Sequence, residues 1–285
     1  MKNRLAVLVP GVALLLTLSG VAGRAQDGGA PGPAAARKPA PPLTKTPDGQ
    51  PDLQGVWLSR GTFISIQDLE YQSLYQQPFK PNPALRGKSL VVDPPDGKIP
   101  YQPWAAAKAK VVLENFTNPT ADTLDGNARC FLHGVPRSLN NREFEIFQPK
   151  GYVVILNMAH HAYRAIPLQG GAHIPETVKL FMGDSRGRWE GNTLLVDVTN
   201  QNDMTWFDAV GSFHSDALHV SERFTIVDSD TVTYEATLTD PRVYTRPWKF
   251  AVRFERARDY GELWEEACHE NNARTIELML KRPER

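Results

Sequence analysis

The sequence predicts a mainly β protein, an antiparallel curled sheet or β-barrel with a few short helices in residues 58–128. From about residue 144 onward, apolar and polar residues alternate with a period of two in short runs, which is typical of strands with one buried and one solvated face. The chain of 285 residues also contains 23 prolines, which favours turns over long helices. Because the edges of a large twisted sheet are a liability, we expect the sheet to curl or close, with a two-sheet sandwich as the alternative.

Eight short runs carry the strand pattern, and Gly191-Asn192 is a favourable pair for a two-residue hairpin turn just before the fourth of them. The runs are 152–158, 162–168, 178–182, 193–199, 218–227, 231–239, 248–255 and 262–269. Helices are expected at 103–114, where Trp104, Ala107 and Val111 have helical spacing, and at 68–77 and 272–281.

The chain divides into three parts. Residues 1–25 combine two basic residues, an apolar stretch and a small-residue cleavage pattern ending at Ala25, which predicts a cleaved signal peptide. An uncleaved membrane anchor is the alternative. Residues 26–50 are rich in Pro, Ala and Gly and predict a disordered linker, and residues 51–285 then form a single β-rich domain. No other apolar run approaches the roughly 20 residues of a spanning helix, so we expect no membrane insertion of the mature chain.

The charge balance bears on partners. Lys and Arg total 32, as do Asp and Glu, so the formal net charge is 0. Once Lys2, Arg4 and Arg24 leave with the signal peptide, 29 of the 32 basic residues remain against 32 acidic ones. A nucleic-acid binder normally has a basic excess, so we expect no nucleic-acid partner.

The only cysteines are Cys130 and Cys268. In an oxidising compartment an even count of two predicts one disulfide, with a buried pair of free thiols as the alternative. A zinc site needs further ligands close to both cysteines, and the two lie far apart in sequence, so we expect no metal.

Several segments together resemble a known family. They include PDLQGVW at residues 51–57, GDSRGRWEGNTL at residues 183–194 and HSDALHVSERF at residues 214–224. With these motifs the chain resembles a family of uncharacterised secreted proteins from soil and marine bacteria. The resemblance covers the mature chain and implies an exported, periplasmic or secreted single domain of about this length, and no residue role. Gly55-x-Trp57 is also similar to the Gly-x-Trp of lipocalins, whose Trp packs under the barrel floor, and it favours a lipocalin-like β-barrel.

Two groups of charged residues are candidates for chemistry. Asp184 and Arg186 lie in a turn and strand start with several other charges; they either point into a barrel mouth or form surface charge pairs. Glu222 falls on an otherwise apolar face of its strand, where a carboxylate must be paired or have a raised pKa. Its partner is then Arg186 or His214 in a working site, or an arginine such as Arg164 or Arg253 in a structural ion pair. If the strand's other face is the inner one, Glu222 is an ordinary surface charge.

The histidines and aromatic residues are further candidates. His214 is a possible catalytic base, and His173 and His219 possible ligand-binding residues; a metal site from His173, His214 and an acid is conceivable, although lone loop histidines are more often surface or hydrogen-bonded residues. His219 and Glu222 are three apart, so on a strand they point to opposite faces.

Trp189, Trp206 and Asp208 lie at the same turns as these histidines. They either line a binding cavity or belong to the core.

These residues favour a secreted β-barrel protein with an internal polar and aromatic site. Walker, GxGxxG, HExxH and GxSxG motifs are absent. We therefore expect a cofactor-independent acid–base enzyme, an isomerase, lyase or hydrolase, acting on a small, partly apolar molecule, with Asp184, Arg186, His214 and Glu222 as catalytic residues. A non-catalytic periplasmic binding protein for a small apolar ligand is the alternative, and a structural or partner-binding surface protein a third.

Overall fold

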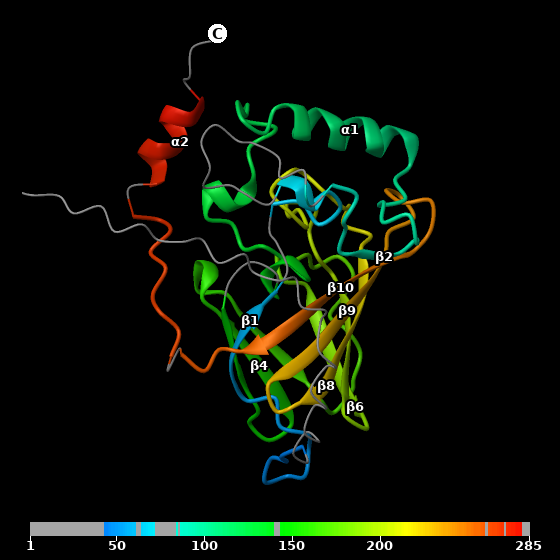
Figure 1. Cartoon of the computed structure of the whole chain (residues 1–285), viewed down its shortest axis with the longest axis vertical. Helices are drawn as coiled ribbons and strands as arrows, with labels where there is room; N and C mark the ends of the chain where they lie inside the picture. The colour runs from blue at the N-terminus through cyan, green and yellow to red at the C-terminus, as the bar shows by residue number, and fades with distance from the viewer. Residues whose placement is uncertain are drawn as a thin grey trace, which may run out of the picture. The chain divides into compact units, whose positions relative to one another are not determined.

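Ten antiparallel strands form a nearly closed, barrel-shaped sheet (Figure 1). The computed structural model describes residues 43–60, 64–71, 84, 86–139, 143–259, 262–270 and 272–280. Along the sheet the strand order is β5-β4-β3-β1-β10-β9-β8-β7-β6, and β2 pairs with β10. The strands are β1 (Gly55–Ser59), β2 (Val91–Asp93), β3 (Phe144–Phe147), β4 (Tyr152–Asn157), β5 (Tyr163–Pro167), β6 (Asp184–Glu190), β7 (Thr193–Thr199), β8 (His219–Asp228), β9 (Thr231–Thr239) and β10 (Trp248–Arg256). The predicted mainly β fold is thus confirmed.

The period-two pattern placed the central strands well. The strand predicted at 231–239 is β9 with identical bounds, and the one at 193–199 is β7. Gly191 has φ +60°, which supplies the backbone conformation that the two-residue turn between β6 and β7 requires. The alternating burial of β8 and β9 shows that one face of each strand lies inside.

Two predicted strands are wrong. Residues 178–182 form a loop in which Leu180 alone pairs, as an isolated parallel bridge with Gln201. The Asn200 side chain donates to the Val178 carbonyl just before this bridge, so pairing does not extend along the run. Residues 262–269 are irregular. Both edges of β10 are already paired, to β9 on one side and to β1 and β2 on the other, so this sheet position offers the later segment no free edge.

The helices were predicted unevenly. Helix α1 (Pro103–Glu114) has the predicted bounds, and α2 (Asn272–Leu280) lies within the predicted range. In the range predicted as a helix at 68–77, the structure has the short 3-10 helix η1 (Leu69–Tyr71), and residues 72–77 lie outside the described part. The described residues also contain the 3-10 helices η3 (Gly126–Arg129), η4 (Arg137–Leu139) and η5 (Ala159–His161).

The last residues of the predicted linker are folded. The predicted signal peptide and residues 26–42 of the predicted linker lie outside the described residues. Residues 43–50 do not extend the linker, because Thr46 and Gly49 close a hydrogen-bonded turn and Lys45 pairs with Pro51. Within the described residues, no helix has both the length and the apolar character needed to cross a membrane.

Large aromatic side chains fill the space inside the sheet. Trp57, Trp248, Tyr234, Phe224 and Phe254 are all fully buried there. Trp57 of the predicted Gly-x-Trp pair donates its indole N–H to the Leu53 carbonyl. The guanidinium of Arg256 lies over the Trp57 ring in a cation–π contact. The interior is therefore a packed core.

Side chains close the gap between the two end strands, β5 and β6. Arg164 of β5 donates from Nε to the Ser185 hydroxyl of β6 at 2.8 Å. A Cβ at Gly187 of β6 would stand 2.7 Å from Cγ2 of Ile166 on β5, so the two strands approach too closely there for a side chain. The barrel is closed at this seam by packing and one side-chain hydrogen bond.

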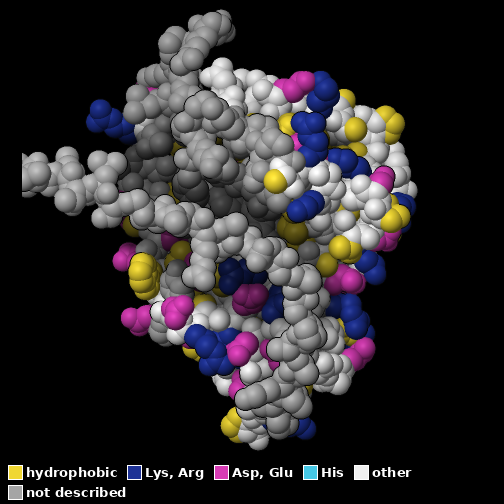
Figure 2. Space-filling model, in the orientation of Figure 1, with side chains coloured by type: hydrophobic (Ala, Val, Ile, Leu, Met, Phe, Trp, Pro, Cys, Tyr) yellow, Lys and Arg dark blue, Asp and Glu magenta, His cyan; other side chains and the backbone are white. Residues whose placement is uncertain are grey.

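The predicted disulfide is confirmed. Cys130 and Cys268 are bonded, with their Cα atoms 5.7 Å apart, and the bond ties the segment before α2 to η3. On the face shown in Figure 2, acidic and basic side chains are interspersed over the described surface. This mixed surface agrees with the formal net charge of 0.

Candidate functional site

The outer face of β6, β7 and β8 carries a group of neighbouring ionisable side chains, Asp184, Arg186, Asp197 and His219. Asp184 and Arg186 alternate with the buried Ser185 and Gly187 on β6, so they point outward. Asp197 lies directly opposite Arg186 on β7, and His219 begins β8. The expectation that Asp184 and Arg186 point into a barrel mouth is wrong, because the strand's parity places Ser185 and Gly187 inside instead.

His173 joins this group from the loop before β6. Its Nδ1 lies 2.7 Å from Oδ2 of Asp184, and its Nε2 lies 2.9 Å from Oδ2 of Asp197. A ring that carries both protons can donate to both carboxylates at once. Arg186 donates to the other oxygen of Asp184 at 2.7 Å and to the Ala172 carbonyl, so it fixes the loop that carries His173.

His219 binds the remaining oxygen of Asp197. The distance from Nε2 of His219 to Oδ1 of Asp197 is 2.5 Å, and the imidazole is 44% exposed. Its Nδ1 has no hydrogen-bond partner among the residues that the structure describes. A carboxylate that holds one nitrogen of an exposed imidazole sets the ring's orientation and leaves the second nitrogen for a bound molecule. We call His173, Asp184, Arg186, Asp197 and His219 the outer cluster.

The pKa values of the two aspartates follow from these contacts. Partial burial by itself would raise the pKa of Asp184, but hydrogen bonds from His173 and Arg186 outweigh it and hold that pKa below its ordinary value. Partial burial likewise acts to raise the pKa of Asp197, and hydrogen bonds from His219 and His173 lower it overall. Both side chains are therefore carboxylates at neutral pH.

A groove of about 360 Å³ opens beside the outer cluster. Its volume is at the lower end for small-molecule sites. His173 and His219 line it together with apolar Ile174 and Leu218. Lys179 also lines it, and its ammonium donates to the Asp216 carbonyl at 2.7 Å. Glu176 and Asp216 line it as well, so the groove combines two imidazoles, an ammonium group and two acidic side chains with apolar walls.

Glu222 belongs to a second group on the inner face of the same sheet. Arg164 donates from both terminal guanidinium nitrogens to the two oxygens of Glu222, one at 3.0 Å. The Tyr234 hydroxyl donates to Oε1 of Glu222 at 2.7 Å. The structural ion pair with Arg164 is therefore confirmed, and pairing of Glu222 with Arg186 or His214 is wrong. We call Arg164, Ser185, Glu222 and Tyr234 the inner network.

His214 lies apart from both groups. Its Nδ1 is 2.9 Å from the Ser215 carbonyl and its Nε2 is 2.7 Å from the Thr205 hydroxyl. Burial lowers its pKa, and the ring stacks on Phe207. Both ring nitrogens of His214 are therefore hydrogen-bonded and its ring is packed against an aromatic side chain, which explains the residue without a catalytic role. His173 has different partners, so a metal site from His173 and His214 is not formed.

Three further predicted residues have structural surroundings. Asp208 is fully buried and accepts from the Ile66 and Ser212 backbone N–H groups and from the Ser212 hydroxyl. Asp208 therefore links the loop that carries it to the loop that carries Ile66. Trp189 and Trp206 are partly buried against the core.

The structure changes the membership of the predicted site. It brings Asp184, Arg186, His173 and His219 together, separates His214 and Glu222 from them, and adds Asp197. Asp197 could have been found, because it is the only charged residue in the alternating run 193–199 and faces away from its apolar neighbours. Lys179 gave no such signal, since a loop places it.

The described residues hold one grouping of three metal-ligand side chains, Cys130, His160 and Cys268, in which both sulfur atoms are engaged in the disulfide. No protein-family model matches the chain, and a search of curated proteins finds no match either.

Proposed function

We propose that this protein is an exported acid–base enzyme that transfers a proton to or from a small, partly apolar molecule bound in the groove beside the outer cluster. The observation that carries the proposal is the Asp197–His219 pair at the groove wall, with Nδ1 of His219 unpartnered among the described residues. The disulfide supports export, because such bonds persist in oxidising compartments.

His219 is the proton-transfer residue in this proposal. Its Nδ1 accepts a proton from the bound molecule while Nε2 remains bound to Asp197, whose charge stabilises the imidazolium that forms. His173 and Arg186 are positioning residues, since they hold Asp197 and Asp184 in place through the contacts at 2.9 and 2.7 Å. Lys179 provides a positive charge in the groove for developing negative charge on the molecule.

The alternative is a binding protein that uses the same groove without turnover. The packed aromatic interior leads us to place a ligand in the outer groove in this case too. Turnover separates the two functions, because a binding protein would hold the compound unchanged.

The test is a screen of small esters, ketones and hydroxy acids by NMR, with ¹³C-labelled histidine in the protein. We expect at least one compound to shift the His219 imidazole signals and to be converted, and conversion to fall about 100-fold or more in His219→Asn. Ser221→Ala is the matched control, since Ser221 is an exposed residue on the same face of β8. A compound that is bound but not converted would favour the binding protein. Failure of every compound to perturb His219 would overturn both functions.

A further inference from the structure

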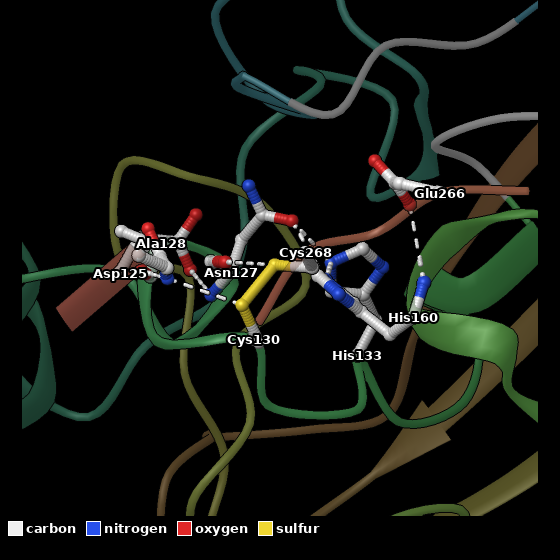
Figure 3. Close-up of a disulfide and its surroundings, with 9 residues drawn as sticks. Asp125, Asn127, Ala128, Cys130, His133, His160, Glu266 and Cys268 are labelled. Carbon is white, nitrogen blue, oxygen red and sulfur yellow. Dashed lines mark hydrogen bonds between the residues drawn. A yellow bond between two sulfur atoms is a disulfide. The ribbon is translucent and has the colours of Figure 1, made fainter. Parts of the chain in front are cut away.

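Side chains capable of binding a metal converge around the disulfide (Figure 3). Nε2 of His133 and Nε2 of His160 lie 2.9 Å apart, and the amide oxygen of Asn127 lies 2.6 and 3.0 Å from them. One ring nitrogen of His160 and the two sulfur atoms all lie within 4.8 Å of one another. One imidazole and two sulfur atoms therefore meet in one place, and the imidazole of His133 lies directly beside that of His160. Three segments of the chain bring these groups together: one with Cys130 and His133, one with His160 and one with Cys268.

Hydrogen bonding alone does not account for this arrangement. A neutral imidazole has one N–H and one lone pair, and an amide oxygen has lone pairs only. Nδ1 of His160 is buried and has no hydrogen-bond partner in the described part of the chain. In either tautomer, His160 thus keeps an unsatisfied N–H or lone pair, which costs free energy.

The surrounding chain holds the donors in fixed positions. His160 has φ 57°, the left-handed region that is uncommon for a residue with a side chain, and its backbone N–H donates to Glu266 at 3.1 Å. Asp125 accepts from the Asn127 backbone N–H at the start of η3 and forms a two-point ion pair with the buried Arg137. The Asp125 contacts anchor the segment carrying Asn127 independently of the disulfide, and the Glu266 contact ties His160 to the segment that carries Cys268. Both restrict the donors, as a preorganised metal site requires.

We propose that reduction of the Cys130–Cys268 disulfide creates a Zn²⁺ site in which both thiolates and the imidazoles of His160 and His133 are the four ligands. Two thiolates and two imidazoles are a common tetrahedral set for structural zinc. Zinc holds sulfur at about 2.3 Å and nitrogen at about 2.0–2.1 Å. The two sulfur atoms must therefore separate, and the His133 ring must turn from its contact with His160 toward them. Disulfide and metal exclude each other, because the same sulfur atoms are used in both.

Reduction of the Cys130–Cys268 disulfide requires two electrons, which a phosphine supplies. A phosphine takes the two sulfur atoms from disulfide to two thiols, with water supplying both protons and the phosphine becoming its oxide. Zn²⁺ then displaces the two thiol protons on binding. Oxidation by a disulfide of a small thiol reverses the change, releasing the metal, re-forming the Cys130–Cys268 bond and leaving the small thiol reduced.

The experiment titrates Co²⁺, a coloured substitute for Zn²⁺, into the whole protein before and after phosphine reduction and anaerobic desalting. We expect the reduced protein to bind one equivalent, with the thiolate-to-cobalt charge-transfer and tetrahedral ligand-field bands, and Zn²⁺ to displace it. The oxidised protein should show no charge-transfer band. His160→Ala should weaken binding about 10-fold or more, and His173→Asn, a histidine substitution in the outer cluster, should leave it unchanged.

A second measurement covers loss of structure on reduction. If the reduced protein unfolds in part, one equivalent of Zn²⁺ should restore the circular dichroism spectrum of the oxidised protein, since binding only the folded form stabilises it. The proposal is overturned if the reduced protein binds no Co²⁺ through thiolate. It is equally overturned if His160→Ala binds Co²⁺ as tightly as the unaltered chain.

Discussion

The inner network and the outer cluster lie on opposite faces of the same strands, yet their chemistry differs. Arg164, Glu222 and Tyr234 are almost fully buried, and each is hydrogen-bonded to another member of the network. His219 and Asp197 are 44% and 40% exposed in their side chains and stand beside a groove. Both groups contain ion pairs, but only the outer one can meet a molecule from solution.

This difference shows that a charge on an apolar strand face can be explained by its partners in the core. A buried carboxylate must find partners in order to fold, and Glu222 has three polar partner contacts from Arg164 and Tyr234. Burial raises the pKa of Tyr234, with the Glu222 charge adding to the effect, so the hydroxyl keeps its proton and donates. The outer cluster has less need of its ion pairs for stability, because solvent screens exposed pairs.

Breaking the inner network should have the largest effect on stability. Glu222→Leu leaves the guanidinium of Arg164 buried without its carboxylate, and we expect the free energy of unfolding to fall by about 3–5 kcal/mol. Urea denaturation measures this. The double variant Arg164→Leu with Glu222→Leu should recover most of the loss, because both charges are then gone. A single variant as stable as the unaltered protein would contradict a structural role for the pair.

A smaller change to the same network should have a smaller effect. Tyr234→Phe removes the hydroxyl that donates to Oε1 of Glu222 and leaves the guanidinium contacts in place. We expect a loss of about 1–3 kcal/mol in urea denaturation. Tyr152→Phe, an exposed tyrosine on β4, is the control and should change stability little. Equal losses in both variants would argue against a contribution from the Glu222 contact.

The two aspartates of the outer cluster should make the free energy of unfolding depend on pH. The pKa values of Asp184 and Asp197 are lower in the folded protein than in an unfolded chain. Their contribution to stability is therefore complete above the unfolded pKa of about 3.9 and is lost as the pH falls through the lower folded values.

Urea denaturation between pH 5 and pH 2.5 should show this loss, and Asp184→Asn should make the decline shallower. Asp122→Asn, in an exposed loop, is the control. An unchanged slope in Asp184→Asn would contradict the contacts described for His173 and Arg186.

The sequence predicts the sheet better than the site. Alternation in runs such as 231–239 and the Gly191-Asn192 turn depend on neighbours in the chain, and such local patterns determine strands directly. The same alternation predicts a strand at 178–182, where the Asn200 side chain binds the Val178 carbonyl and pairing is limited to a single bridge at Leu180. No local sequence pattern reveals a hydrogen bond from a side chain to a backbone carbonyl 22 residues away.

The composition of the outer cluster depends on which face of its strand each side chain takes and on where the loop before β6 places His173. Parity correctly separates His219 from Glu222, and it could have turned Asp184 and Arg186 outward, had Ser185 and Gly187 been taken as the inner residues. The contact of His173 with Asp184 and Asp197 comes from a loop. The approach of His160 to the disulfide, with His133 beside it, comes from folding of three segments. Distance along the sequence between Cys130 and Cys268 was therefore a poor reason to exclude a metal there.

The central claim, that the inner network supports the fold while the outer cluster carries function, is tested most directly by measuring two variants side by side. Glu222→Gln and His219→Asn are compared for free energy of unfolding in urea and for conversion of the best compound from the NMR screen. We expect Glu222→Gln to lose several kcal/mol and, in the fraction that remains folded, to keep its activity. His219→Asn should lose less than about 1 kcal/mol and nearly all conversion. The reverse pattern, an inactive but stable Glu222→Gln and an active His219→Asn, would contradict the account.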